Sequence, residues 1–159
     1  ECCIFFGLLC SLGAAQTMTV TGPTLAQPGR EITMLVSAAN TGAAAIQWLV
    51  ELPAGYTATA AIGSAGVAAG KTLACGPRMC LISGMNATPI PDGIVAVYTI
   101  TAPPTPSGPK PIVLSELLGA DAEGSRVEIS SAATYSICSS RQICGNRHAG
   151  GVQTGGAVQ

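Results

Sequence analysis

The stretch that decides the fold is Ile46-Gln-Trp-Leu-Val-Glu-Leu-Pro-Ala-Gly-Tyr56. Its residues alternate with period two: Ile46, Trp48 and Val50 form one set, and the intervening positions include Gln47 and Glu51. This alternation is typical of a half-buried β-strand, and the polar members mark the wet side. The sequence therefore predicts a strand with Trp48 directed into a core, ended by Pro-Ala-Gly.

The flanking sequence repeats this kind of pattern, with turn residues every eight to twelve positions. The most strongly β-like run follows Asp92-Gly and reads Ile94-Val-Ala-Val-Tyr-Thr-Ile-Thr101, with Tyr98 in its inward set. Nine short strands with such turns favour an all-β sandwich of the jelly-roll or immunoglobulin-like type. An Ala-rich region, 58–69, is interrupted by glycines and is interpreted as strand and loop, so no helix is expected. The nine predicted strands are 17–21, 31–39, 45–52, 56–62, 71–75, 79–83, 94–101, 112–118 and 126–137.

Composition excludes several classes of function. Charged residues make up 9% of the 159 residues and the formal net charge is −1. A nucleic-acid-binding domain needs a basic patch, and a helix that binds an anionic membrane surface needs a basic face. The sequence offers neither, so a nucleic-acid partner is not expected.

The first fifteen residues differ in character from the rest. Cys2-Cys-Ile-Phe-Phe-Gly-Leu-Leu-Cys10 is apolar, and small residues follow at Gly13 and Ala15. This order is typical of a secretory signal peptide, and a buried first strand is the alternative. We therefore expect a signal remnant at 1–15, a sandwich domain at 16–137, a Cys- and Gly-rich tail or linker at 138–159, and a secreted or cell-surface location.

Four cysteines remain after the signal segment, an even number that suggests disulfides in an exported chain. The turn sequence Gly-Pro-Arg-Met separates Cys75 from Cys80, and a hairpin there would bring them within disulfide reach. Cys138 and Cys144 are the second expected pair. The spacings do not match a zinc site, and no metal site is expected.

The order of these segments resembles the cohesin modules of bacterial cell-surface and polysaccharide-degrading systems. The resemblance covers roughly residues 17–136. It rests on the third strand closing on the turn Glu51-Leu-Pro53, on Asp92-Gly-Ile-Val-Ala-Val-Tyr-Thr-Ile, and on Ser115-Glu-Leu-Leu-Gly-Ala-Asp-Ala122. It implies a nine-stranded sandwich that binds rather than catalyses, with a dockerin-like calcium-binding module of another protein as its partner.

The resemblance also implies where the partner binds. Cohesins present the third, fifth, sixth and eighth strands as a flat face, and by strand order we assign 45–52, 71–75, 79–83 and 94–101 to it. Alternation then places eight side chains outward, forming an apolar patch of the kind that marks interaction sites. The predicted partner face comprises Gln47, Leu49, Glu51, Leu81, Ser83, Val95, Val97 and Thr99.

Catalytic residues are not expected, and no cofactor is implied. Asp121 and Glu123 are interpreted as a solvated turn, with a calcium cluster as the alternative, and His148 lies in the Gly-rich tail. Two other functions stay open. One is a carbohydrate-binding module that uses Tyr56 or Tyr135 as a surface aromatic and takes a polysaccharide as its partner. The other is a structural subunit of a fibre or surface layer that self-associates through strand edges.

Overall fold

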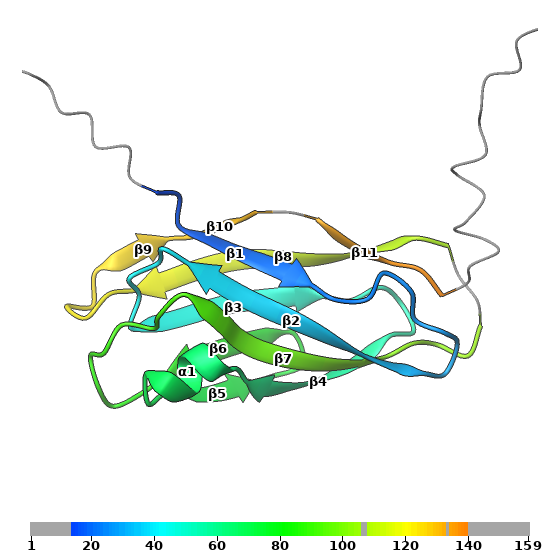
Figure 1. Cartoon of the computed structure of the whole chain (residues 1–159), viewed down its shortest axis with the longest axis horizontal. Helices are drawn as coiled ribbons and strands as arrows, with labels where there is room; N and C mark the ends of the chain where they lie inside the picture. The colour runs from blue at the N-terminus through cyan, green and yellow to red at the C-terminus, as the bar shows by residue number, and fades with distance from the viewer. Residues whose placement is uncertain (1–13, 106–107, 133, 140–159) are drawn as a thin grey trace, which may run out of the picture.

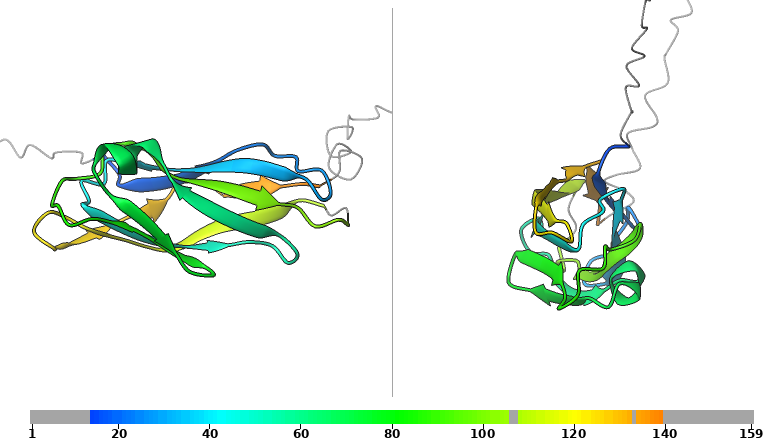
Figure 2. Two further views of the ribbon diagram at one scale, coloured as in Figure 1. Left: turned by 90° about the horizontal axis from the view of Figure 1, so that it is seen from below. Right: turned by 90° about the vertical axis from the view of Figure 1, so that its left-hand side faces the viewer.

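Two twisted sheets pack face to face in an elongated sandwich whose strands run roughly along the long axis (Figure 1). The computed structural model describes residues 14–105, 108–132 and 134–139. Most of the predicted signal segment lies outside this range, as do 140–159 of the tail with Cys144 and His148. Seen from one end, the two layers enclose a shared core (Figure 2).

The first sheet has the strand order β10-β1-β2-β7-β4. All its neighbours are antiparallel except β1 and β10, which pair in parallel. We call it the β2 sheet. Its strands are β1 (Thr17–Thr21), β2 (Glu31–Ala39), β4 (Thr57–Ile62), β7 (Gly93–Thr101) and β10 (Ser130–Ser131).

The second sheet has the order β11-β8-β3-β6-β5, and β9 also pairs with β8. We call it the β3 sheet, after its central strand. Its strands are β3 (Ala45–Glu51), β5 (Thr72–Cys75), β6 (Met79–Ser83), β8 (Lys110–Ala120), β9 (Arg126–Glu128) and β11 (Tyr135–Ile137).

The core is built from the alternating positions that the sequence pattern indicates. β3 buries every second residue, and β2 does so over its second half. Burial of aliphatic and aromatic surface between the two sheets is the main stabilising term. The prediction of an all-β sandwich is confirmed. The largest fully buried side chains include Met18, Met34, Ile46, Trp48, Ile82 and Ile100.

The strand predicted at 126–137 is three short strands instead of one. β9 pairs with β8, β10 crosses to pair with β1, and β11 returns to β8. The prediction of one strand is wrong here because the chain moves between the two sheets, and each crossing interrupts the hydrogen-bond ladder.

The expectation of no helix is also wrong at one place. α1 (Ser64–Ala68) is a short helix that contacts β7 and β5 (Figure 1). A Cβ on Gly66 would meet a methyl carbon of Ile82 at 2.4 Å, so the absent side chain lets this turn approach the core. None of the described segments forms an apolar helix of membrane-spanning length.

A polar contact fixes the loops after α1 and β6. Lys71 is only 6% exposed, and its Nζ donates hydrogen bonds to the backbone oxygen and Oδ1 of Asn86 at 2.9 and 2.7 Å. The Asn86 Nδ2 donates in turn to the carbonyl of Ala69 at 3.1 Å. The buried lysine is thus held by neutral oxygens of a single residue.

Two β-bulges interrupt the alternation. Between β2 and β7 the register changes at Val36/Ser37, so β7 has one extra residue there and both Val95 and Ala96 are buried. Between β3 and β8 it changes between Gln47 and Leu49, and the extra residue lies on β8. A bulge places two residues opposite one and redirects side chains locally.

Candidate partner-binding face

The β3 sheet turns one side to solvent across β8, β3, β6 and β5. Along β3 and β6, and over the first half of β8, partly or fully exposed residues alternate with buried ones. Hydrogen-bonded neighbours then place Leu81, Gln47 and Leu118 in one row and Met79, Leu49 and Ser115 in the next. We call this surface the β3 face; it comprises Gln47, Leu49, Glu51, Met79, Leu81, Ser83, Val113, Ser115 and Leu118.

The β3 face carries exposed apolar side chains. Met79 is 40% exposed, and Leu81 and Val113 are each 39% exposed. Leu49 and Leu118 are half-buried between them. Large apolar side chains gathered on one surface and edged by polar groups are typical of a protein-interaction site.

Five of the eight residues predicted for the partner face lie on this surface: Gln47, Leu49, Glu51, Leu81 and Ser83. The strand 94–101 does not, because it is β7, the seventh strand, and pairs with β2 and β4 in the other sheet. Val97 and Thr99 are half-buried there. Val95 is fully buried, because the bulge in β7 turns it into the core.

Sequence reasoning missed four members of the β3 face: Met79, Val113, Ser115 and Leu118. The strand that completes the surface is β8, which pairs with six residues of β3 between Ala45 and Glu51. A correct count of the predicted strands would have assigned 112–118 to the eighth place. The bulge would still have hidden the register of its second half.

Polar groups lie at one edge of the β3 face. The guanidinium of Arg78 lies 3.7 Å from Glu51 Oε1, and the hydroxyl of Ser115 donates to the same oxygen at 3.2 Å. The two charged side chains are 67% and 48% exposed, so the ion pair adds little stability. It does fix where these two charges lie.

Beneath the β3 face, a buried polar contact joins the two sheets. The indole Nε1–H of Trp48 donates to the hydroxyl oxygen of Tyr98 at 2.9 Å. The Tyr98 oxygen lies 2.9 Å from Cys80 Sγ. Because Cys80 forms a disulfide with Cys75, its sulfur has no proton and the tyrosine is the donor. The predicted inward orientation of Trp48 and Tyr98 is confirmed.

This environment changes the acidity of Tyr98. Burial raises the pKa of its hydroxyl to about 12, although the hydrogen bond from Trp48 opposes the shift. Tyr98 is therefore neutral at physiological pH and can act as both acceptor and donor. The Cys75–Cys80 disulfide joins β5 to β6 beside it. For the second expected pair, Cys138 is buried and Cys144 lies outside the described residues.

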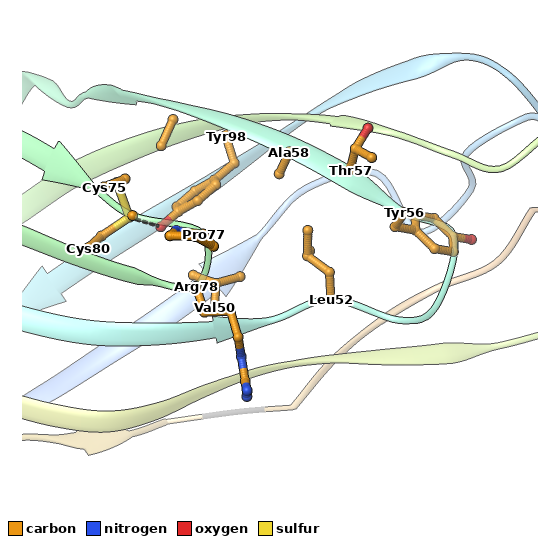
Figure 3. A pocket seen from close by; sticks show the side chains of 12 residues that line it. Val50, Leu52, Tyr56, Thr57, Ala58, Cys75, Pro77, Arg78, Cys80 and Tyr98 are labelled. Atoms are coloured by element: carbon orange, nitrogen blue, oxygen red, sulfur yellow. Dashed lines mark hydrogen bonds between the residues drawn. A yellow bond between two sulfur atoms is a disulfide. The ribbon is translucent and has the colours of Figure 1, made fainter.

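A cavity of about 290 Å³ lies next to this contact, between β4 and the β5–β6 hairpin. Figure 3 shows Tyr98, Cys80 and Val50 on one side of it and the ring of Tyr56 at the other, with the Tyr56 hydroxyl directed away. Among the described lining residues, Arg78 alone is charged. A specific small-molecule site usually needs several convergent polar groups, and this cavity does not assemble them.

The two aromatic residues considered for sugar binding are not on the surface. Tyr56 and Tyr135 are each only 7% exposed. The Tyr135 hydroxyl donates to the carbonyl of Pro23, and its burial raises its pKa. Neither ring can stack on a sugar without local opening, so the interpretation of these tyrosines as surface aromatics is wrong.

The acidic turn after β8 is organised by its own backbone. Asp121 Oδ1 accepts hydrogen bonds from the amides of Glu123 and Ser125 at 3.0 and 2.7 Å. Within the described ranges, no three His, Cys, Asp or Glu side chains are grouped to hold a metal ion. Asp121 thus shapes a turn in the way that Asx motifs do.

Neither a scan of protein-family models nor a search of curated protein sequences finds a match to this chain. Solved structures do match. A non-cellulosomal cohesin from Archaeoglobus fulgidus superposes with a TM-score of 0.62 at 18% identity, over 79% of this chain and 93% of that one. The chain has a cohesin-type fold.

Two further cohesins agree. The cohesin module of a Clostridium perfringens family 33 glycoside hydrolase gives a TM-score of 0.60 at 13% identity, over 78% of this chain and 96% of its own length. A type II cohesin module from the ScaA scaffoldin of Acetivibrio cellulolyticus gives a TM-score of 0.61 at 14% identity, over 76% of this chain and 96% of that module. At such identities the likeness establishes the fold, and function must be argued from the site.

Proposed function

We propose that this cohesin-like chain is a non-catalytic module that binds a dockerin-like protein through the β3 face. The observation that carries the proposal is the exposure of three large apolar side chains, Met79, Leu81 and Val113, on one side of the β3 sheet. The cohesin-type fold supports a protein partner. The polar contact between Trp48 and Tyr98 below the sheet supports a rigid surface, which lowers the entropic cost of binding.

We also propose that the module acts outside the cell or on its surface, in an extracellular assembly such as one that degrades polysaccharides. The Cys75–Cys80 disulfide supports this location, because such bonds persist mainly in oxidising compartments. The signal-like segment at 1–15 is consistent with export. Direct carbohydrate binding has less support, since Tyr56 and Tyr135 are buried.

The proposal is tested with a panel of purified dockerin modules, using calorimetry in calcium and again in EDTA. We expect at least one dockerin to bind the wild-type chain in calcium. Leu81→Asp should weaken that binding by roughly 30-fold or more, because it places a charge among the exposed apolar side chains of the β3 face.

Leu49→Asp and Val97→Asp form a matched pair. Both positions are half-buried and face outward from a central strand, but they lie on opposite sheets. Only Leu49→Asp should reduce binding. A panel in which no dockerin binds would refute the partner class, and equal losses in the two variants would refute the β3 face.

A further inference from the structure

One charged residue of β8 lies, by its register, between two rows of the β3 face. Glu116 lies in the bulge of β8, where Leu49 pairs with Ser115 and Gln47 pairs with Leu118. Glu116 and Leu117 therefore lie together opposite Trp48. Leu117 packs against the core, whereas Glu116 is exposed.

The neighbouring charges are already paired. Glu51 is bonded to Arg78 and Ser115, and Glu128, which lies beside Leu118, pairs with Arg126. Among the described residues, none forms a hydrogen bond or an ion pair with the Glu116 side chain. At this bulge β8 thus carries an exposed carboxylate without a cation, between the pair Leu49–Ser115 and the pair Gln47–Leu118 of the β3 face.

The backbone at Glu116 is unusual for its residue type. Its φ is +49°, in the left-handed region that glycine and asparagine adopt at lower cost. A Cβ-bearing glutamate at this position costs stability that a glycine would not. Because the side chain makes no contact that would repay this cost within the fold, the position suggests a role for the carboxylate outside the chain.

We infer that Glu116 selects the partner of the β3 face, and that this partner places a lysine or arginine side chain against it. The inference rests on the proposed function and adds the chemistry of the partner. A protein that covers Met79, Leu81 and Val113 also removes water from Glu116. A carboxylate that loses water without gaining a cation is strongly unfavourable, so partners without a basic group at this point are rejected.

The test is a selection from a display library of dockerin modules with randomised surface positions, made in parallel on the wild-type chain and on the Glu116→Lys variant. Binders selected on the wild type should share a lysine or arginine at one position. Binders selected on Glu116→Lys should carry aspartate or glutamate there. Affinity of the wild-type binders for Glu116→Gln should fall about 30-fold, and the loss should shrink at high salt.

A second variant separates binding from folding. Glu116→Gly removes the carboxylate and relieves the backbone, so its thermal midpoint should equal or exceed that of the wild type, while its binding falls as far as that of Glu116→Gln. If both variants instead lower the midpoint, Glu116 has a structural role and the inference is wrong.

The remaining outcomes also decide between the two proposals. Binders that Leu49→Asp disrupts, but that lack a shared basic residue and tolerate Glu116→Gln, would overturn the role of Glu116 and leave the β3 face intact. If the wild-type chain enriches no binder, or only binders that Leu49→Asp leaves unaffected, the proposed function fails and the inference fails with it.

Discussion

Replacing Tyr98 with phenylalanine should destabilise this protein measurably, although it removes only one oxygen atom. In the native structure that oxygen accepts from Trp48 Nε1 and donates to Cys80 Sγ, both at 2.9 Å. Trp48 is fully buried, so its N–H cannot turn to water when the acceptor is lost. A buried donor left without an acceptor costs roughly 1–3 kcal/mol, and we expect a loss of about 2 kcal/mol.

Tyr56→Phe is the matched control. Tyr56 is also buried, but its hydroxyl has no hydrogen-bond partner among the described residues. Removing an unpaired buried hydroxyl relieves a desolvation cost, so stability should stay the same or rise by about 1 kcal/mol. The two variants delete the same atom type from the same residue type, and only the partner differs.

Urea unfolding followed by fluorescence is the assay, because Trp48 is the single tryptophan of the chain and reports on this contact directly. The free energy of unfolding is obtained by linear extrapolation. A Tyr98→Phe variant as stable as the wild type would refute the reasoning. So would a Tyr56→Phe variant that loses as much as Tyr98→Phe.

The burial of Tyr98 predicts a loss of stability in alkali. The pKa of Tyr98 is raised to about 12 in the folded protein, whereas an unfolded tyrosine titrates near 10. The contribution of neutral Tyr98 to the free energy of unfolding is therefore complete below pH 10. It is lost as the pH rises through 12, and the loss is at most roughly 3 kcal/mol. The Tyr98→Phe variant should lack this part of the pH dependence, which urea titrations between pH 8 and 12 would reveal.

Three further changes test the framework around the β3 face. Asn86→Ala removes Oδ1, one of the two oxygens that accept from the buried Nζ of Lys71, and should cost about 1.5–3 kcal/mol in urea unfolding. Reducing the disulfide, or Cys75→Ser with Cys80→Ser, should cost about 2 kcal/mol by the loop-closure estimate, and an unchanged urea midpoint would contradict it. Val95→Ala should cost about 1–3 kcal/mol if the bulge buries it as described, and a neutral effect would contradict that burial.

Much of the fold can be predicted from the sequence because each strand of a sandwich has one solvent-exposed side and one buried side. The alternation around Trp48 identified β3, its buried face and the position of the indole. The turn between Cys75 and Cys80 likewise indicated the β5–β6 hairpin. Such features depend on residues close together in the chain, and period and turn chemistry report them directly.

The β3 face was harder to predict from the sequence, because it depends on which strands, distant in the chain, become neighbours in the sheet. Alternation cannot tell that β8 rather than β7 lies beside β3, since both are apolar runs of similar length. It also fails at a bulge, where one extra residue reverses the orientation of those that follow. Val95 and Glu116 were both missed for this reason: one is buried where alternation placed it outside, and the other acquires its position only from the register of β8.

The parallel pairing of β1 with β10 joins segments of the chain that are synthesised far apart in time. The amide of Ser130 donates to the carbonyl of Gln16, which lies 114 residues earlier in the chain. At 5–20 residues per second, a ribosome needs roughly 6–23 s between making the two. Until then the outer edge of β1 is unpaired, and β8 also lacks β11, which follows β10 in the chain. A nascent chain that stops short of Ser130 therefore exposes two open strand edges, to which other chains can pair until β10 and β11 are made.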